Sequence, residues 1–219
     1  MAGPGLATQQ LTLVILAGGH SRRMGEDKPG LLFPGPGGLP LIRRLRERLG
    51  VIAGVPLIAG PHDYGTGWPV VADDPRLEGP AAGVVAGLGA APGELALVLA
   101  ADLPFPSPAL ALGLAELAGR HPELEAVVPV HRGRLEPLFA IYRRSASAAL
   151  LRVGHSGASG ARGPALRELL PQLRLLPVAE ATWREWDPEA LSFINCNTRE
   201  ELAQAAQREV GPRTKGGTP

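Results

Sequence analysis

The sequence predicts an α/β fold of three layers, in which an open and mostly parallel sheet is flanked by helices on both faces. Short apolar runs typical of buried strands alternate along the chain with segments of helical periodicity, and this alternation is typical of βαβ units. At 219 residues and 45% hydrophobic composition, the chain is long enough for one domain with a substantial core. We expect a single domain over residues 1–210 and a disordered tail over residues 211–219.

The first half of the chain contains three predicted strands and two predicted helices. Residues 11–16 form an uninterrupted apolar run, as expected for a strand buried on both faces. Leucines spaced by four residues predict a helix over residues 39–49, with its arginines facing solvent. Shorter apolar runs predict strands at residues 55–59 and 70–72. A segment rich in small residues predicts a helix from residue 78 to about residue 90.

Residues 95–101 are the most apolar segment, and we expect them to be the central strand. A helix is predicted over residues 108–120. Two further strands are predicted at residues 126–130 and 138–142. The turn residues 131–134 between them allow an antiparallel pair at one edge of the sheet.

Near the carboxyl end, residues 191–196 predict a late strand. Thr198 and Glu201 have the spacing of a capping box, which starts a helix that runs to about residue 210. The glycine-dense segment 154–163 fits a linker and a flap over a binding site equally well.

Composition excludes several classes of protein. A net charge of +1 argues against general binding of nucleic acid. The single cysteine, Cys196, excludes an internal disulfide and fits a reducing cytoplasm. The five histidines and one cysteine lack zinc-site spacing, and no apolar run is long enough to span a membrane. We therefore expect a cytoplasmic protein without membrane or nucleic-acid partners.

Gly18 and Gly19 follow the first predicted strand directly. Glycines allow a sharp turn close to a ligand, and the amides exposed in such a turn bind anions. Arg22, Arg23 and Lys28 add positive charge nearby, although neither the Walker A spacing nor the dinucleotide fingerprint is present. The sequence therefore predicts a phosphate-binding loop at the carboxyl end of this strand.

Acidic residues end two other predicted strands. Asp73 and Asp74 follow the third strand, and Asp102 follows the central one. Ligands of open α/β sheets bind at the carboxyl ends of the strands, and Mg²⁺ takes one or two carboxylates together with phosphate oxygens and water. Asp102 is the strongest metal-ligand candidate, because the prolines that follow it delay the next helix and make a capping role poor.

Four segments carry a resemblance to a known family. Residues 16–28 match Leu-x-Gly-Gly-x-x-x-Arg-Met-Gly-x-Asp-Lys, and Asp73 is followed by the motif Gly-Pro-x-Ala-Gly. Asp102 begins an Asp-x-Pro-Phe motif, and residues 193–198 match Phe-x-Asn-x-Asn-Thr. From Val14 to about Leu202, the chain resembles the molybdenum cofactor guanylyltransferase (MobA) family of nucleotidyltransferases, which implies a Rossmann-like fold.

The resemblance implies transfer of GMP from GTP to the phosphate of molybdopterin, with or without molybdenum bound, and release of pyrophosphate. It implies that Asp102 binds Mg²⁺ and the nucleotide, and that Asp73 contacts the guanine nucleotide. Arg22 and Lys28 are expected to neutralise the departing pyrophosphate. The nucleotide-binding residues expected in the glycine turn, through their backbone amides, are Leu16, Ala17, Gly18 and Gly19.

For the acceptor, the resemblance points to Asn195 and Asn197, and Arg162 is a candidate for its phosphate. Glu136 stands where the family has Gln or His before a proline, which puts its role in doubt. Because both reactants are anions, a basic cleft is expected at this edge of the sheet.

Three alternatives remain open on the sequence alone. A cytidylyltransferase would transfer CMP from CTP to the same pterin, and a sugar-phosphate nucleotidyltransferase would share the loop and Asp102 but use another acceptor. A nucleotide-binding regulatory protein without catalysis is the alternative of a different class. Protein partners that deliver the pterin or receive the finished cofactor are compatible with the resemblance.

Overall fold

The computed structural model describes residues 11–18, 30, 32–33, 38–50, 52–54, 56–156, 164–196 and 198–209. Its helices are α1 Leu41–Leu49, α2 Pro80–Ala90, α3 Pro108–Arg120, α4 Ala146–Ser156, α5 Leu166–Leu169, α6 Glu180–Trp183 and α7 Arg199–Glu209, with 3₁₀ turns η3 Leu170–Gln172 and η4 Leu191–Phe193. Its strands are β1 Leu11–Leu16, β2 Leu57–Ala59, β3 Val70–Val71, β4 Leu95–Ala100, β5 Ala126–His131, β6 Arg134–Leu135, β7 Phe139–Arg143 and β8 Leu175–Val178.

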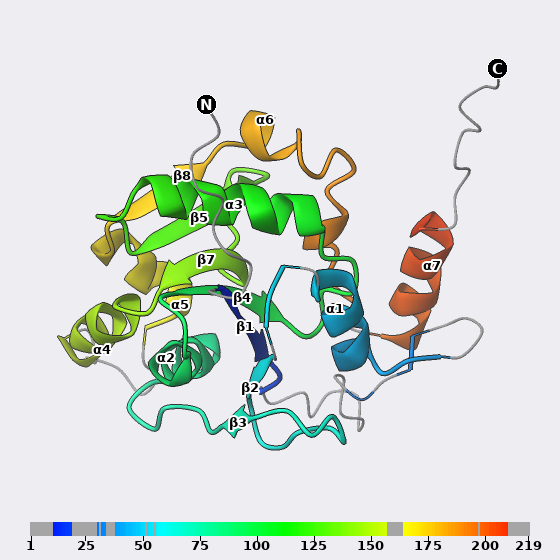
Figure 1. Ribbon diagram of the computed structural model, residues 1–219, viewed down its shortest axis with the longest axis horizontal. Helices are drawn as coiled ribbons and strands as arrows, with labels where there is room; N and C mark the ends of the chain where they lie inside the picture. The colour runs from blue at the N-terminus through cyan, green and yellow to red at the C-terminus, as the bar shows by residue number, and fades with distance from the viewer. Residues whose placement is uncertain are drawn as a thin grey trace.

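The strands form one sheet in the order β3-β2-β1-β4-β7-β5-β6, and β8 pairs with β5 (Figure 1). The pairs among β3, β2, β1 and β4 are all parallel, so the predicted central strand is confirmed as β4. The predicted antiparallel pairing of β5 with β7 is also confirmed. β7 lies inside the sheet, between β4 and β5, and β8 lies on the other side of β5 and forms the edge (Figure 1).

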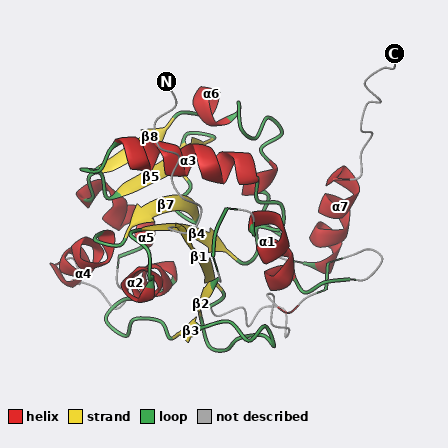
Figure 2. Cartoon of the chain, in the orientation of Figure 1, coloured by secondary structure: helices red, strands yellow, loops and turns green. Residues whose placement is uncertain are grey.

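Helices cover both faces of the sheet, which confirms the three-layer prediction (Figure 2). On one face α1 and α3 pack on alternate residues of the central strands, such as Leu13 and Leu97. On the other face α2, α4 and α5 pack on the residues between them, such as Val14 and Val98. Because both faces are covered, β1 and β4 are buried along their whole length and must be apolar at every position but Thr12.

The predicted strand at residues 191–196 is wrong. Residues 191–193 form the 3₁₀ turn η4 instead, because the Asp187 carboxylate accepts the amides of Leu191 (3.3 Å) and Ser192 (2.9 Å). Ala190 has a φ of 56°, in the left-handed region, which turns the chain away from an extended path. β8, which pairs with β5, was not predicted from the sequence, and neither were α4 and the short α5 and α6.

Three predictions about the second half of the chain have different outcomes. The capping box of α7 is confirmed, because the Glu201 amide donates to Oγ1 of Thr198 (3.0 Å) and the Thr198 amide donates to the Glu201 carboxylate (3.2 Å). Residues 154–156 of the predicted glycine-dense loop are the last turn of α4. The rest of that loop and the tail predicted at 211–219 lie outside the described residues.

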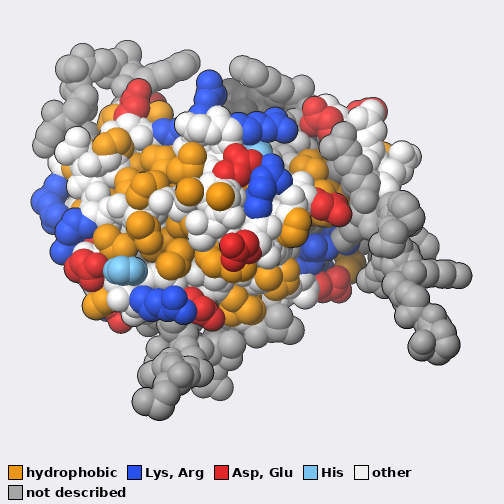
Figure 3. All heavy atoms as spheres, turned by 90° about the horizontal axis from the view of Figure 1, so that it is seen from above, with side chains coloured by type: hydrophobic (Ala, Val, Ile, Leu, Met, Phe, Trp, Pro, Cys, Tyr) orange, Lys and Arg blue, Asp and Glu red, His pale blue; other side chains and the backbone are white. Residues whose placement is uncertain are grey.

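The surface above α3 and α6 carries acidic, basic and apolar side chains side by side (Figure 3). This mixture agrees with the net charge of +1, which argued against a general polyanion-binding protein. Among the described residues, no helix combines the length and apolar character needed to cross a bilayer.

The small-residue helix α2 packs close to β1, as its glycines suggest. A β-carbon placed at Gly87 would lie 2.3 Å from Cγ1 of Val14, a stiff side chain in the buried β1. We expect Gly87→Ala to lower the free energy of unfolding by about 1–3 kcal/mol, measured by urea denaturation.

Gly89 in the same helix provides the matched control. No atom lies within 4 Å of a β-carbon placed there, so Gly89→Ala should raise the free energy of unfolding by about 0.5–1 kcal/mol. Equal effects of the two substitutions would contradict close packing of α2 on β1.

Candidate active site

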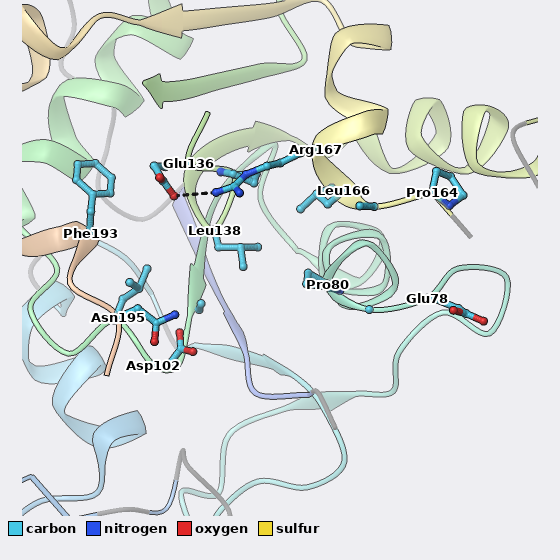
Figure 4. Close-up of a pocket in the computed structure, with 15 residues that line it drawn as sticks. Glu78, Pro80, Asp102, Glu136, Leu138, Pro164, Leu166, Arg167, Phe193 and Asn195 are labelled. Atoms are coloured by element: carbon cyan, nitrogen blue, oxygen red, sulfur yellow. Dashed lines mark hydrogen bonds and ion pairs between the residues drawn. The ribbon is translucent and has the colours of Figure 1, made fainter. Parts of the chain in front are cut away.

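A cavity of about 480 Å³ opens at the carboxyl ends of the parallel strands (Figure 4). This volume lies within the usual range of small-molecule sites. Its wall is formed by the residues that follow β4, the residues that precede β7, and the residues at the beginnings of α2 and α5. The lining residues are Glu78, Gly79, Pro80, Ala100, Asp102, Leu103, Glu136, Pro137, Leu138, Pro164, Ala165, Leu166, Arg167, Phe193 and Asn195.

Topology explains why these distant segments meet. β1 and β4 are parallel and in register from Leu11 opposite Leu95 to Leu16 opposite Ala100, so both strands end at the same edge. β7 runs antiparallel to β4, so the residues before β7 lie at that edge too. The Ala100 amide donates to the Leu138 carbonyl (3.0 Å) and fixes the two sides of the cavity against each other.

The predicted phosphate loop begins where β1 ends. The Ala17 amide donates to the Ala59 carbonyl (2.9 Å), and the Ala17 carbonyl accepts from the Tyr64 hydroxyl (2.7 Å). The Ala17 amide is therefore already used within the sheet, which corrects the expectation that it is free to bind phosphate. Gly18 is the first residue beyond these bonds, and Leu16 lies within β1, between β2 and β4. Gly19, Arg22 and Lys28 lie outside the described residues.

Asp73 lies directly over this turn. A β-carbon placed at Gly18 would be 3.0 Å from Oδ2 of Asp73, and one placed at Gly83 would be 3.2 Å from Oδ1. Partial burial against these glycines raises the pKa of the Asp73 carboxyl above its ordinary value. Small residues at both positions therefore let the carboxylate approach the end of β1.

Asp74 has a different, structural environment. Its carboxylate accepts the amide of Arg76 (2.9 Å) and forms an ion pair with the Arg76 guanidinium (2.6 Å), which closes the turn after β3. Of the two neighbouring carboxylates, only Asp73 is directed at the glycine turn. Among the described contacts, Asp73 thus approaches Gly18 and Gly83, and Asp74 pairs with Arg76.

Asp102 is partly exposed and lines the cavity, with the Asn195 side chain near it in Figure 4. The N-cap of α3 is Ser107, whose side chain accepts the Leu110 amide (3.2 Å), so Asp102 does not cap that helix, as predicted. The Asp102 carbonyl accepts the Cys196 amide (2.9 Å). This bond brings Asn195 and the end of β4 together across a long stretch of sequence.

Glu136 lies at the other end of the cavity in Figure 4 and is paired with Arg167 (3.4 Å). Arg167 also donates to the Leu135 carbonyl (3.1 Å), so its guanidinium is anchored beside Glu136. Partial burial raises the pKa of the Glu136 carboxyl despite this pair. Arg167 was not predicted from the sequence, because one arginine in a leucine-rich segment carries no local sign of its partner.

The described lining of the cavity is not basic. It contains the acidic residues Glu78, Asp102 and Glu136 and one basic residue, Arg167. The predicted basic cleft is therefore not met by the described residues. Arg162 and Asn197, like the cations of the phosphate loop, lie outside them.

The donor set of this edge fits a hard divalent cation only in part. Within the described ranges, no cluster of three or more His, Cys, Asp or Glu side chains could hold a metal ion. The Asp102 carboxylate and the Asn195 amide are nevertheless oxygen donors on the cavity wall, and Mg²⁺ usually takes one or two carboxylates and completes its shell with substrate phosphates and water. The site therefore suits a cation that arrives with a phosphate-bearing ligand.

Comparisons with known proteins point to one family. The sequence model described as "MobA-like NTP transferase domain" matches residues 13–175. A probable molybdenum cofactor guanylyltransferase of Chloroflexus aggregans is 36% identical over 199 residues, which cover 86% of this chain and 90% of that protein. A molybdenum cofactor guanylyltransferase of Desulfosudis oleivorans is 32% identical over 199 residues, with 89% and 94% covered.

A solved structure has the same fold. Molybdopterin-guanine dinucleotide biosynthesis protein A of Archaeoglobus fulgidus has a TM-score of 0.72 to this chain at 24% identity, and the match covers 91% of this chain and 98% of that one. The two proteins thus share the α/β fold.

The raised pKa of Asp73 gives a test of its partial burial. Because the folded protein binds this proton more tightly than the unfolded chain, stability falls as pH rises through the interval between the unfolded and the folded pKa. Asp73→Asn should therefore melt at a higher temperature than the wild type at about pH 7, and the difference should disappear at about pH 3.

Asp74→Asn is the control, since it weakens the pair with Arg76 and should lower the melting temperature at neutral pH. If Asp73→Asn also lowered it, Asp73 would be a stabilising residue like its neighbour.

Proposed function

Because this chain belongs to the MobA-like NTP transferase family, we propose that it transfers GMP from GTP to the phosphate of molybdopterin, with or without molybdenum bound, and releases pyrophosphate. The observation that carries the proposal is the position of Asp102, which follows β4 beside the end of β1 and also lines the cavity. A nucleotide held by the glycine turn and an acceptor held in the cavity would meet at this carboxylate.

The main physical task of such a reaction is to bring two anions together in line. Catalysis of phosphoryl and nucleotidyl transfer depends mostly on positioning and on neutralising charge. In this proposal the amides from Gly18 onward hold the nucleotide phosphates, and Arg22 and Lys28 neutralise the departing pyrophosphate. Asp73, placed over Gly18, orients the guanine nucleotide.

Asp102, assisted by Asn195, would hold Mg²⁺ between the reactants. When bound there, the ion would supply positive charge to the phosphate oxygens, which the acidic lining of the described cavity does not supply. Since the second pKa of a phosphate monoester is about 6, the acceptor phosphate is largely ionised at neutral pH, and the chain needs no general base.

The acceptor is assigned to the cavity between Asp102 and Glu136. Its walls at Leu138, Leu166 and Phe193 are apolar and suit a flat heterocycle, whereas Asp102 suits the phosphate end. Asn195 on the cavity wall, Asn197 and Arg162 remain predicted acceptor contacts. A cytoplasmic location, and contact with proteins that deliver the pterin or accept the product, are part of the same proposal.

The nucleotide is tested by an assay that separates the alternatives. The enzyme is incubated with Mg²⁺, molybdopterin and one of the four nucleoside triphosphates, and pyrophosphate release is followed. We expect release with GTP only, and only when the pterin is present. Release with CTP would identify a cytidylyltransferase. Release with a sugar phosphate in place of the pterin would identify a sugar-phosphate nucleotidyltransferase. Binding of GTP without any release would leave a regulatory protein.

The role of Asp102 is tested by Asp102→Ala and Asp102→Asn. Loss of an electrostatic contact to the reacting groups should lower kcat at least about 10²-fold, with the melting temperature almost unchanged because the side chain is partly exposed. A remote carboxylate on α3 serves as control: Glu116→Ala removes only a surface pair with Arg120 and should keep wild-type kcat. Near-normal pyrophosphate release by Asp102→Ala would reject the metal assignment.

A further inference from the structure

The chain has two tyrosines, and both of their hydroxyls end on backbone carbonyls next to the site. The Tyr64 hydroxyl donates to the Ala17 carbonyl (2.7 Å), at the end of β1. The Tyr142 hydroxyl donates to the Pro137 carbonyl (3.0 Å), in the segment before β7 that lines the cavity. One hydroxyl therefore supports the glycine turn, and the other supports the cavity wall.

Tyr64 is held in place by an organised loop. Its φ of 53° lies in the left-handed region, which is uncommon for a tyrosine, so the surrounding contacts must hold this conformation. The Asp63 carboxylate accepts the amides of Gly65 (3.0 Å) and Gly67 (3.0 Å), and Arg43 of α1 donates to the Gly65 carbonyl (2.5 Å). The loop is thus braced on both sides of the tyrosine.

The bond from Tyr64 completes the hydrogen bonding of Ala17. The amide of Ala17 already donates to Ala59, and its carbonyl accepts from Tyr64, so both polar groups of this residue are fixed. The chain therefore leaves β1 in one defined direction. That direction sets where the Gly18 amide can point.

Tyr142 holds the cavity wall in the way that Tyr64 holds the end of β1. It lies in the interior strand β7, where it pairs with Ala96 of β4 and Ala126 of β5, and its side chain is 0% exposed. Burial raises the pKa of the Tyr142 hydroxyl, which therefore stays a donor at working pH. Its acceptor Pro137 lies between Glu136 and Leu138, which both line the cavity.

We propose that Tyr64 and Tyr142 are positioning residues that each serve one substrate: Tyr64 fixes the nucleotide turn, and Tyr142 fixes the acceptor wall. The assignment of the two sides rests on the proposed function. Neither hydroxyl touches a reactant in this proposal, since each acts through the carbonyl that it holds.

The two hydroxyls can be removed separately, and each variant is the control of the other. Tyr64→Phe should raise the KM for GTP about 3- to 10-fold and leave the KM for molybdopterin unchanged, as expected for loss of one hydrogen bond. Tyr142→Phe should raise the KM for molybdopterin by a similar factor and leave the KM for GTP unchanged. Both constants are measured by initial rates of pyrophosphate release with the other substrate saturating.

Ser147→Ala removes a third hydroxyl, one that donates to the Arg144 carbonyl (2.9 Å) at the start of α4, and should change neither KM. A purely structural role of the tyrosines would lower the melting temperatures of both variants without the crossed pattern of KM values. Such a result, or an equal rise of both KM values in either variant, would overturn the proposal.

A failure of the proposed function looks different, because it affects the wild type. If the wild type released no pyrophosphate, calorimetric titration with GTP and Mg²⁺ would still decide the role of Tyr64. A dissociation constant for GTP that is 3- to 10-fold higher in Tyr64→Phe than in the wild type, and unchanged in Tyr142→Phe, supports the inference. Equal affinities of the two variants overturn it.

Discussion

The parallel pairing of β1 with β4 is the interaction on which the site depends. Six consecutive residues of each strand are in register, and the ladder continues beyond them, because the Ala101 amide donates to the Leu16 carbonyl (3.0 Å). Since both strands are buried on both faces, a shift of register would move apolar side chains and backbone groups out of place along the whole pair. This pairing keeps the end of β1, with Gly18, beside the end of β4, with Asp102, although 84 positions separate these residues in sequence.

The second wall of the site comes from the antiparallel β7. Had this strand been parallel to β4, the segment that precedes it would lie at the opposite edge of the sheet. Its reversed direction brings residues 136–138 to the carboxyl edge, where Glu136 meets Arg167 from the start of α5. The proposed nucleotide side, built on parallel strands, and the proposed acceptor side, built around one reversed strand, therefore share a single edge. This arrangement suits a reaction between two separately bound ligands.

The acidic lining at this edge of the sheet suits a reaction in which positive charge arrives with the substrate. The described lining holds three carboxylates and one guanidinium, and the guanidinium is committed to Glu136. Two phosphate-bearing reactants would be repelled by this lining alone, which is why we propose Mg²⁺ at Asp102 and roles for Arg22 and Lys28 in neutralising phosphate charge. The raised pKa values of Asp73 and Glu136 have the same origin, because each carboxylate is partly desolvated at the edge of the site instead of facing open water.

By itself the sequence determined most of the alternating elements, the central place of β4, the capping box of α7 and the polar residues that follow the strands. Each of these features depends on residues that are consecutive or a few positions apart. The sequence placed Gly18, Asp73 and Asp102 at one edge through the rule that parallel strands end together. It failed at residues 191–196, where the apolar pattern fits a strand but the Asp187 carboxylate holds the amides in a turn. Only the tertiary structure decided that Asp73 and not Asp74 faces the glycines, that Arg167 pairs with Glu136, and that the two tyrosine hydroxyls reach Ala17 and Pro137. Each of these contacts depends on where a side chain is directed after packing, and no local periodicity encodes that direction.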